Sequence, residues 1–184
     1  MGVVEGGRVF DLGDLRPSIH PSAYLAAGSI VVGGVTIGEG CSIWFNAVLR
    51  SDTAPITLGR NVNVQDNCTL HADPGFPVLL EDGVSLGHGA IVHGAHVEAG
   101  SLIGMGAVVM NGAHIGRSCL IAGGAVVLPG TVVPPNSLVA GVPAKVRREL
   151  DDSERATVGN TAMSYHGRIA RFQAELNEVG FSGS

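Results

Sequence analysis

The sequence predicts an all-β protein, a parallel β-helix of hexapeptide repeats with a C-terminal α-helix packed alongside. The main observation is an aliphatic residue at every sixth position from Val97 to Val139, with a small residue four places after most of them. Neither a helix nor an ordinary strand has a six-residue period. This period is typical of a β-helix in which each hexad supplies one short strand and one corner, and three hexads complete a coil. The inward positions are Val97, Ile103, Val109, Ile115, Ile121, Val127, Val133 and Val139.

The same period extends through the front of the chain. It is unbroken from Ile19 to Leu49, then slips at residues 53–55 and again at residues 73–77. We expect two short loops at these slips, and loops on a regular scaffold often carry function. The pattern predicts about six to seven coils of about eighteen residues, with residues 19–144 as the β-helix domain and residues 1–18 as an N-terminal arm or edge strand. Between the slips and after them, the predicted inward residues are Leu58, Val64, Leu70, Leu80, Leu86 and Ile91.

A different period begins after residue 144, so residues 145–184 are predicted to form a C-terminal helix and tail. Val158, Ala162, Tyr165 and Ile169 follow one another at steps of four and three, as on the apolar face of an amphipathic helix. We expect the helix to begin near Ser153, with Asp152 or Ser153 as its N-cap. Its apolar face should pack against the β-helix.

Composition and charge exclude several classes of function. A net charge of −5 leaves no basic surface for nucleic acid. No apolar run approaches the ~18 residues that a membrane span needs, and no secretory leader opens the chain, so we expect a cytoplasmic protein without a membrane partner. Cys41, Cys68 and Cys119 occupy small inward positions of the repeat. Their spacing favours neither a disulfide nor a thiolate metal site.

Three histidines have positions in the repeat that favour metal binding. His71 and His93 each follow the start of the same side of successive coils, so their imidazoles should lie on strands ~4.8 Å apart. Such a pair can share a metal ion at ~2.0–2.1 Å from each nitrogen. His88 follows the start of a different side and should lie around a corner. In a threefold trimer, His88 of a neighbouring subunit could complete a three-histidine site.

Other polar residues fall on the same two sides of the coil. Arg50 and Asp52 should lie one coil before His71, and Gln65 and Asp66 one coil before His88. A trimer interface would then place Arg50 and Asp52 opposite Gln65 and Asp66. An arginine–aspartate pair across that interface could lock the subunits together and orient a substrate.

These residues also carry a family resemblance. The chain resembles the gamma-class carbonic anhydrase family in four segments within the repeats: Arg50-Ser51-Asp52, Asn63-Val64-Gln65-Asp66, Leu70-His71, and residues 87–94. The resemblance implies a left-handed β-helix, a homotrimer, and a metal ion at each subunit interface: zinc, with iron or cobalt as alternatives. It implies that His71 and His93 of one subunit and His88 of the next bind this metal. The implied reaction is reversible hydration of CO2 to bicarbonate by a metal-bound hydroxide.

The resemblance implies supporting roles for six further residues near the metal. Gln65 would hydrogen-bond the hydroxide or bicarbonate, and Asn63 would help shape the pocket. Arg50 and Asp66 would form the interface pair, with Asp52 beside it. Tyr165 would approach the site from the C-terminal helix.

One departure and two alternatives accompany this interpretation. The family prototype has a longer acidic loop with a proton-shuttling glutamate between its first two metal histidines, whereas the segment 72–77 supplies only Asp73. Hydration of CO2 needs a route for the released proton, so we expect a less efficient enzyme. The repeats also fit a hexapeptide acyltransferase, which would use a donor acyl thioester and a histidine base without a metal. A third interpretation is a catalytically weak scaffold or assembly protein.

Overall fold

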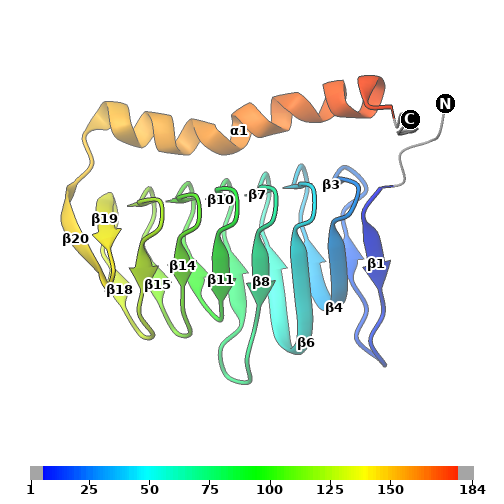
Figure 1. Ribbon diagram of the computed structural model, residues 1–184, viewed down its shortest axis with the longest axis horizontal. Coiled ribbons are helices and arrows are strands. Elements are labelled where there is room, and N and C mark those ends of the chain that lie inside the picture. The colour runs from blue at the N-terminus through cyan, green and yellow to red at the C-terminus, as the bar shows by residue number, and fades with distance from the viewer. Residues whose placement is uncertain (1–5, 178–184) are drawn as a thin grey trace, which may run out of the picture.

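The computed structural model describes residues 6–177, and its strands wind into a parallel β-helix (Figure 1). About seven coils follow one another, and each coil has three flat faces. The predicted fold class is confirmed. The strands of the 12-stranded sheet are β1 (Arg8–Phe10), β2 (Ser18–Ile19), β4 (Ile30–Ile37), β6 (Val48–Leu58), β8 (Thr69–His71), β9 (Val78–Leu80), β11 (Ile91–His93), β12 (His96–Val97), β14 (Val108–Val109), β15 (His114–Ile115), β17 (Val126–Val127) and β18 (Val132–Val133).

A second, 8-stranded sheet forms the remaining face. Seven of its strands are parallel, and the last one, β20, returns antiparallel to β19. Its strands are β3 (Tyr24–Leu25), β5 (Ser42–Ile43), β7 (Asn63–Val64), β10 (Ser85–Leu86), β13 (Leu102–Ile103), β16 (Leu120–Ile121), β19 (Ser137–Gly141) and β20 (Ala144–Glu149).

The 12-stranded sheet spans two faces because β4 and β6 continue around a corner. The first part of β6 pairs with β8 and its last part pairs with β9. We call the face with β8, β11, β14 and β17 the first face, and the face with β9, β12, β15 and β18 the second face. The 8-stranded sheet is the third face.

Inward aliphatic side chains stack from coil to coil and form the core. On the first face Leu49, Leu70 and Val92 occupy successive strands in register, and each is 0% exposed. The prediction of Ile91 as an inward residue is wrong, because Val92 pairs with Leu70 while Ile91 pairs with Thr69 and is 38% exposed. The period therefore slips after Val92 rather than before it.

The two interruptions of the repeat differ in structure. Residues 53–55 do not form the expected loop, because they lie within the continuous strand β6. The register between β4 and β6 shifts there, and the extra residues of β6 lie between the Gly33–Ser51 pair and the Val35–Ile56 pair. Gly33 has a φ of 78°, and the Ser51 carbonyl oxygen occupies the space that a Cβ would need. Residues 73–77 do form a loop, closed by an antiparallel bridge between Asp73 and Phe76.

The three cysteines lie in the core, as their positions in the repeat predicted. Cys41, Cys68 and Cys119 are each 0% exposed. Burial raises the pKa of the Cys68 thiol to about 12 and that of Cys41 to about 11. Thiols with such pKa values are protonated at neutral pH and are poor nucleophiles. Their role is packing.

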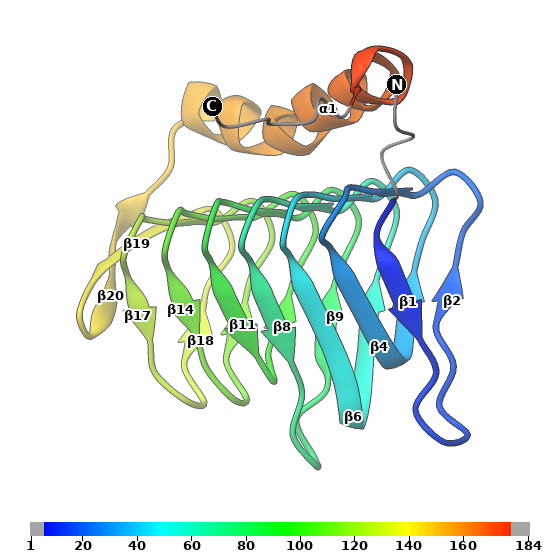
Figure 2. The same ribbon diagram turned by 45° about the vertical axis from the view of Figure 1, so that its right-hand side comes forward.

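The helix α1 (Asp152–Glu175) runs back along the length of the β-helix toward the first coils (Figure 2). It begins one residue earlier than expected, and its N-cap is Asp151, whose carboxylate accepts from the backbone N–H of Glu154 in a capping box. The helix lies against β5, β7 and β13 on the third face. Trp44 packs there edge-on against the rings of Tyr165 and Phe172. This contact fixes Tyr165 above the third face.

The helix is no membrane span. Within residues 6–177, no helix combines the length and the apolar sequence that crossing a bilayer requires.

Candidate metal site

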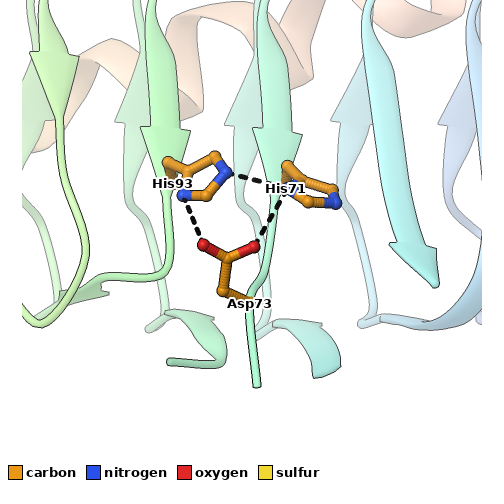
Figure 3. Close-up of side chains that lie close together, drawn as sticks. All are labelled: His71, Asp73 and His93. Carbon is orange, nitrogen blue, oxygen red and sulfur yellow. Dashed lines mark hydrogen bonds and ion pairs between the residues drawn. The ribbon is translucent and has the colours of Figure 1, made fainter. Parts of the chain in front are cut away.

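Two of the predicted ligands, His71 and His93, lie side by side on the first face. They end the paired strands β8 and β11 and occupy the same register position, with ring centroids 4.8 Å apart (Figure 3). His71 Nδ1 lies 2.8 Å from His93 Nε2. Nitrogen ligands on a tetrahedral metal lie about 3.3 Å apart, given metal–nitrogen distances of about 2.0–2.1 Å. The two imidazoles therefore fit a shared metal after a small separation of the rings.

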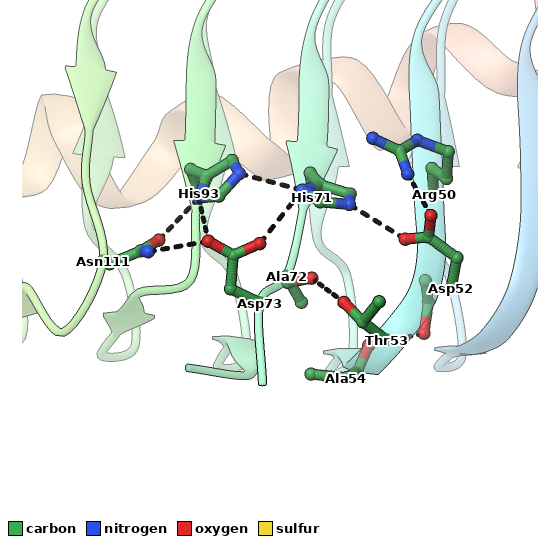
Figure 4. Close-up of polar contacts among 10 residues, drawn as sticks. Arg50, Asp52, Thr53, Ala54, His71, Ala72, Asp73, His93 and Asn111 are labelled. Carbon is green, nitrogen blue, oxygen red and sulfur yellow. Dashed lines mark hydrogen bonds and ion pairs between the residues drawn. The ribbon is translucent and has the colours of Figure 1, made fainter. Parts of the chain in front are cut away.

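The outer side of each imidazole is held by a hydrogen bond. His71 Nε2 lies 2.9 Å from Asp52 Oδ1, and this contact lowers the pKa of the Asp52 carboxyl. Arg50 contacts the second oxygen of Asp52 (Figure 4). His93 Nδ1 lies 2.5 Å from Asn111 Oδ1. Partners of this kind fix the orientation of metal-binding histidines.

Asp73 and Asn111 complete this cluster, and sequence reasoning did not place them there. Asn111 Nδ2 donates to Asp73 Oδ2 at 2.9 Å. His71, Asp73 and His93 each offer one ligand atom within 4.8 Å of the others. Two imidazoles and a carboxylate are donors that zinc and iron accept. The position of Asn111, one coil after His93, was the available signal in the sequence.

His88 lies on the third face, just beyond β10, with a separate group of predicted residues. Its Nδ1 lies 2.7 Å from Asp66 Oδ2, and its backbone N–H donates to Gln65 Oε1 at 3.2 Å. The hydroxyl of Tyr165 reaches down from α1 to His88 Nε2 at 3.1 Å. Since the carboxylate of Asp66 accepts a hydrogen bond from Nδ1–H, Nε2 has the lone pair and accepts a hydrogen bond from the tyrosine hydroxyl. The nitrogen available to a metal is therefore Nε2.

Asn63 lies on the same face, in β7. It is 1% exposed, and its Oδ1 accepts from the Ser42 hydroxyl at 3.1 Å. Within residues 6–177, its buried Nδ2 has no hydrogen-bond partner. The amide is held in place with one donor unused.

The predicted site residues thus form two groups on different faces. Arg50, Asp52, His71 and His93 share the first face, whereas Asn63, Gln65, Asp66, His88 and Tyr165 lie on or above the third. One chain does not bring the groups together. The expected Arg50–Asp66 pair stays a prediction about an assembly, because within this chain Arg50 contacts Asp52 and Asp66 contacts His88.

Comparison with known proteins finds both carbonic anhydrases and hexapeptide transferases. The model of the bacterial transferase hexapeptide family (six repeats) matches residues 16–51 and 94–129. A Geobacillus kaustophilus protein named carbonic anhydrase is 50% identical over 75% of this chain and 76% of its own. The mitochondrial gamma carbonic anhydrase 2 of Arabidopsis thaliana is 33% identical over 91% of this chain and 62% of its own. A Bacillus cereus crystal structure described as a candidate acetyltransferase has a TM-score of 0.90 and 39% identity, covering 92% of this chain and 99% of its own.

Proposed function

Since the chain belongs to the hexapeptide-repeat family of gamma-class carbonic anhydrases, we propose that it catalyses the reversible hydration of CO2 to bicarbonate at a metal centre. One observation carries the proposal: His71 and His93 direct two nitrogens at each other on an outer face of the coil. No packing role explains this geometry, because inward residues form the core and the two imidazoles point away from it.

We propose that the metal lies between subunits of a homotrimer. His71 and His93 would hold it from one copy, and His88 from the next. His88 needs a second copy because it lies on another face of its own chain, where its Nε2 contacts the Tyr165 hydroxyl. A trimer with threefold symmetry repeats the contact between the first face of one copy and the third face of the next, and so closes with three equivalent sites.

Exposed apolar side chains near both groups support such a contact. On the first face, Ile91 and Met110 border a pocket beside His93, and they are 38% and 36% exposed. On the third face, Met105 lies one coil after His88 and is 65% exposed. Burial of these side chains would contribute to association, at about 25 cal/mol for each Å² of apolar surface.

The chemistry of the donor set fits a divalent cation, with zinc expected and iron or cobalt as alternatives. When bound, such a cation lowers the pKa of a coordinated water to about 7 and so supplies hydroxide at neutral pH. The residues of the chain orient the ligands and the substrate. Asp66 accepts a hydrogen bond from His88 Nδ1, which leaves Nε2 free for the cation. Asp52 accepts a hydrogen bond from His71 Nε2, which leaves Nδ1 free.

Gln65 and Asn63 would act on the substrate. The Gln65 side chain touches the backbone of His88 and is 4% exposed, so its amide is fixed next to a ligand. A fixed amide can hydrogen-bond CO2 or bicarbonate without paying the entropy of ordering a side chain. The Asn63 Nδ2 group is an unused donor on the same face.

Metal content and CO2 hydration, measured on one anaerobically purified sample, test this function. We expect about one divalent ion per chain by elemental analysis and stopped-flow hydration that is lost on chelation and restored by the metal. Hydration that persists after complete metal removal would contradict the proposal. A protein that binds no metal after reconstitution and hydrates no CO2 would favour acyl transfer or a scaffold role instead.

A further inference from the structure

The hydrogen bonds around the first-face cluster determine which ligand atoms remain free. The carboxylate of Asp52 can only accept, so His71 Nε2 holds the proton and His71 Nδ1 has the lone pair. Asn111 donates through Nδ2 to Asp73 Oδ2, so its Oδ1 accepts and His93 Nδ1 is the donor. His93 Nε2 therefore has a free lone pair. Asp73 Oδ1 has no partner among the hydrogen bonds of the described residues.

The three residues that carry these free atoms form one cluster, and each offers a ligand atom within 4.8 Å of the others. His71 Nδ1 lies 2.8 Å from His93 Nε2 and 3.9 Å from Asp73 Oδ1. Figure 3 shows the carboxylate of Asp73 turned toward the space between the two rings. The first separation is shorter, and the second longer, than the ~3.3 Å between ligands of a tetrahedral ion by about half an ångström, and small side-chain rotations can supply both adjustments.

Asn111 supports two of the three ligands at once. Its oxygen holds His93 and its amide nitrogen holds Asp73, while Asp52 holds His71 from the other side (Figure 4). Outer partners of this kind typically change metal affinity by about 10- to 100-fold when they are lost.

We propose that a single chain binds a divalent first-row cation through His71 Nδ1, His93 Nε2 and Asp73 Oδ1, without His88 of a second copy. The inference rests on the proposed function and deepens it, since it assigns metal loading to one subunit. Two imidazoles and one carboxylate form a set with open positions that suits Fe²⁺, Co²⁺ and Zn²⁺. On assembly, His88 joins this set from the neighbouring copy and Asp73 becomes free to leave the ion.

Cobalt titration of the His88→Ala variant tests the inference. We expect the metal-stripped variant to bind about one Co²⁺ per chain, with visible absorption bands. Because a direct ligand is lost, its affinity should be at least about 10-fold below that of the wild type. Adding Asp73→Asn should lower the affinity by a further 10-fold or more. The introduced amide turns its oxygen to the Asn111 N–H and therefore directs its NH2 group at the ion, which repels it.

A matched control uses a carboxylate on another face. Glu98 accepts from His114 at 2.8 Å on the second face, so Glu98→Gln in the His88→Ala background removes a similar histidine–carboxylate contact. This control should leave the Co²⁺ affinity unchanged. Circular dichroism checks that each variant keeps the fold, as expected for side chains that are 44% exposed at His88 and 41% exposed at Asp73.

The outcomes separate this inference from the proposed function. If the wild type binds Co²⁺ and folded His88→Ala does not, the single-chain site is wrong while the shared site stands. The inference is equally wrong if Asp73→Asn leaves the affinity of His88→Ala unchanged. A wild-type protein that binds no Co²⁺ overturns the proposed function and this inference together.

Discussion

Replacing His88 by Ala is expected to reduce CO2 hydration by about 100-fold or more, because loss of a group that merely orients a ligand already costs about 10- to 100-fold. The variant removes a ligand from every shared site and also frees the carboxylate of Asp66, which accepts from His88 at 2.7 Å. The side chain is 44% exposed and lies outside the core, so the coil should stay folded. Stopped-flow hydration at saturating metal measures the effect.

His96→Ala is the control for this variant. His96 pairs with Glu81 at 2.8 Å on the second face, is also partly exposed, and belongs to neither group of site residues. Its replacement should leave hydration within about twofold of the wild type, since surface changes away from a site rarely matter. Equal losses in both variants would mean that His88 has no special role.

The largest expected effect on stability comes from Ile103→Ala. Ile103 is 0% exposed and stacks in register between Leu86 and Ile121 on the inner side of the third face. Truncation leaves a cavity that the neighbouring coils cannot close, because their backbones are held by the sheet. We expect the free energy of unfolding to fall by about 2–5 kcal/mol. Chemical denaturation followed by circular dichroism, at one fixed chain concentration, measures the loss.

Val132→Ala provides the comparison for that loss. Val132 lies in a strand of the same β-helix but points outward and is 74% exposed. Its truncation should change the free energy of unfolding by no more than about 0.5 kcal/mol. A loss from Ile103→Ala that does not exceed the loss from Val132→Ala would show that the inward ladder is not the main source of stability.

The sequence predicted the coil well because inward and outward positions differ in chemistry. The inward position of each short strand carries an aliphatic residue, and this pattern repeats with each coil through residues such as Leu70 and Ile103. Local slips are harder to locate. Between Leu86 and Val97 the spacing is one residue short of two hexads, and either Ile91 or Val92 satisfies the pattern. Pairing with Leu70 in the preceding coil selects Val92, and only the three-dimensional register reveals that pairing.

The candidate site was partly predictable for a similar reason. His71 and His93 were paired correctly because both come just after the start of the same side, one coil apart, although the inward residue before His93 is Val92 and not the predicted Ile91. His88 was correctly placed on a different face. Asp73 and Asn111 were missed as members of the site. Asp73 reaches it through the bridge that closes the loop 73–77, and Asn111 is one of many outward polar residues until its two hydrogen bonds are seen.

Subunit mixing tests the shared metal site most directly. His71→Ala lacks a first-face ligand and His88→Ala lacks the third-face ligand, so neither variant alone should hydrate CO2 appreciably. In an equal mixture, about one interface in four joins an intact first face to an intact His88, so hydration should recover to about a quarter of the wild-type rate. If mass spectrometry shows that subunits have exchanged and hydration does not rise above that of the separate variants, the metal site is not shared between subunits.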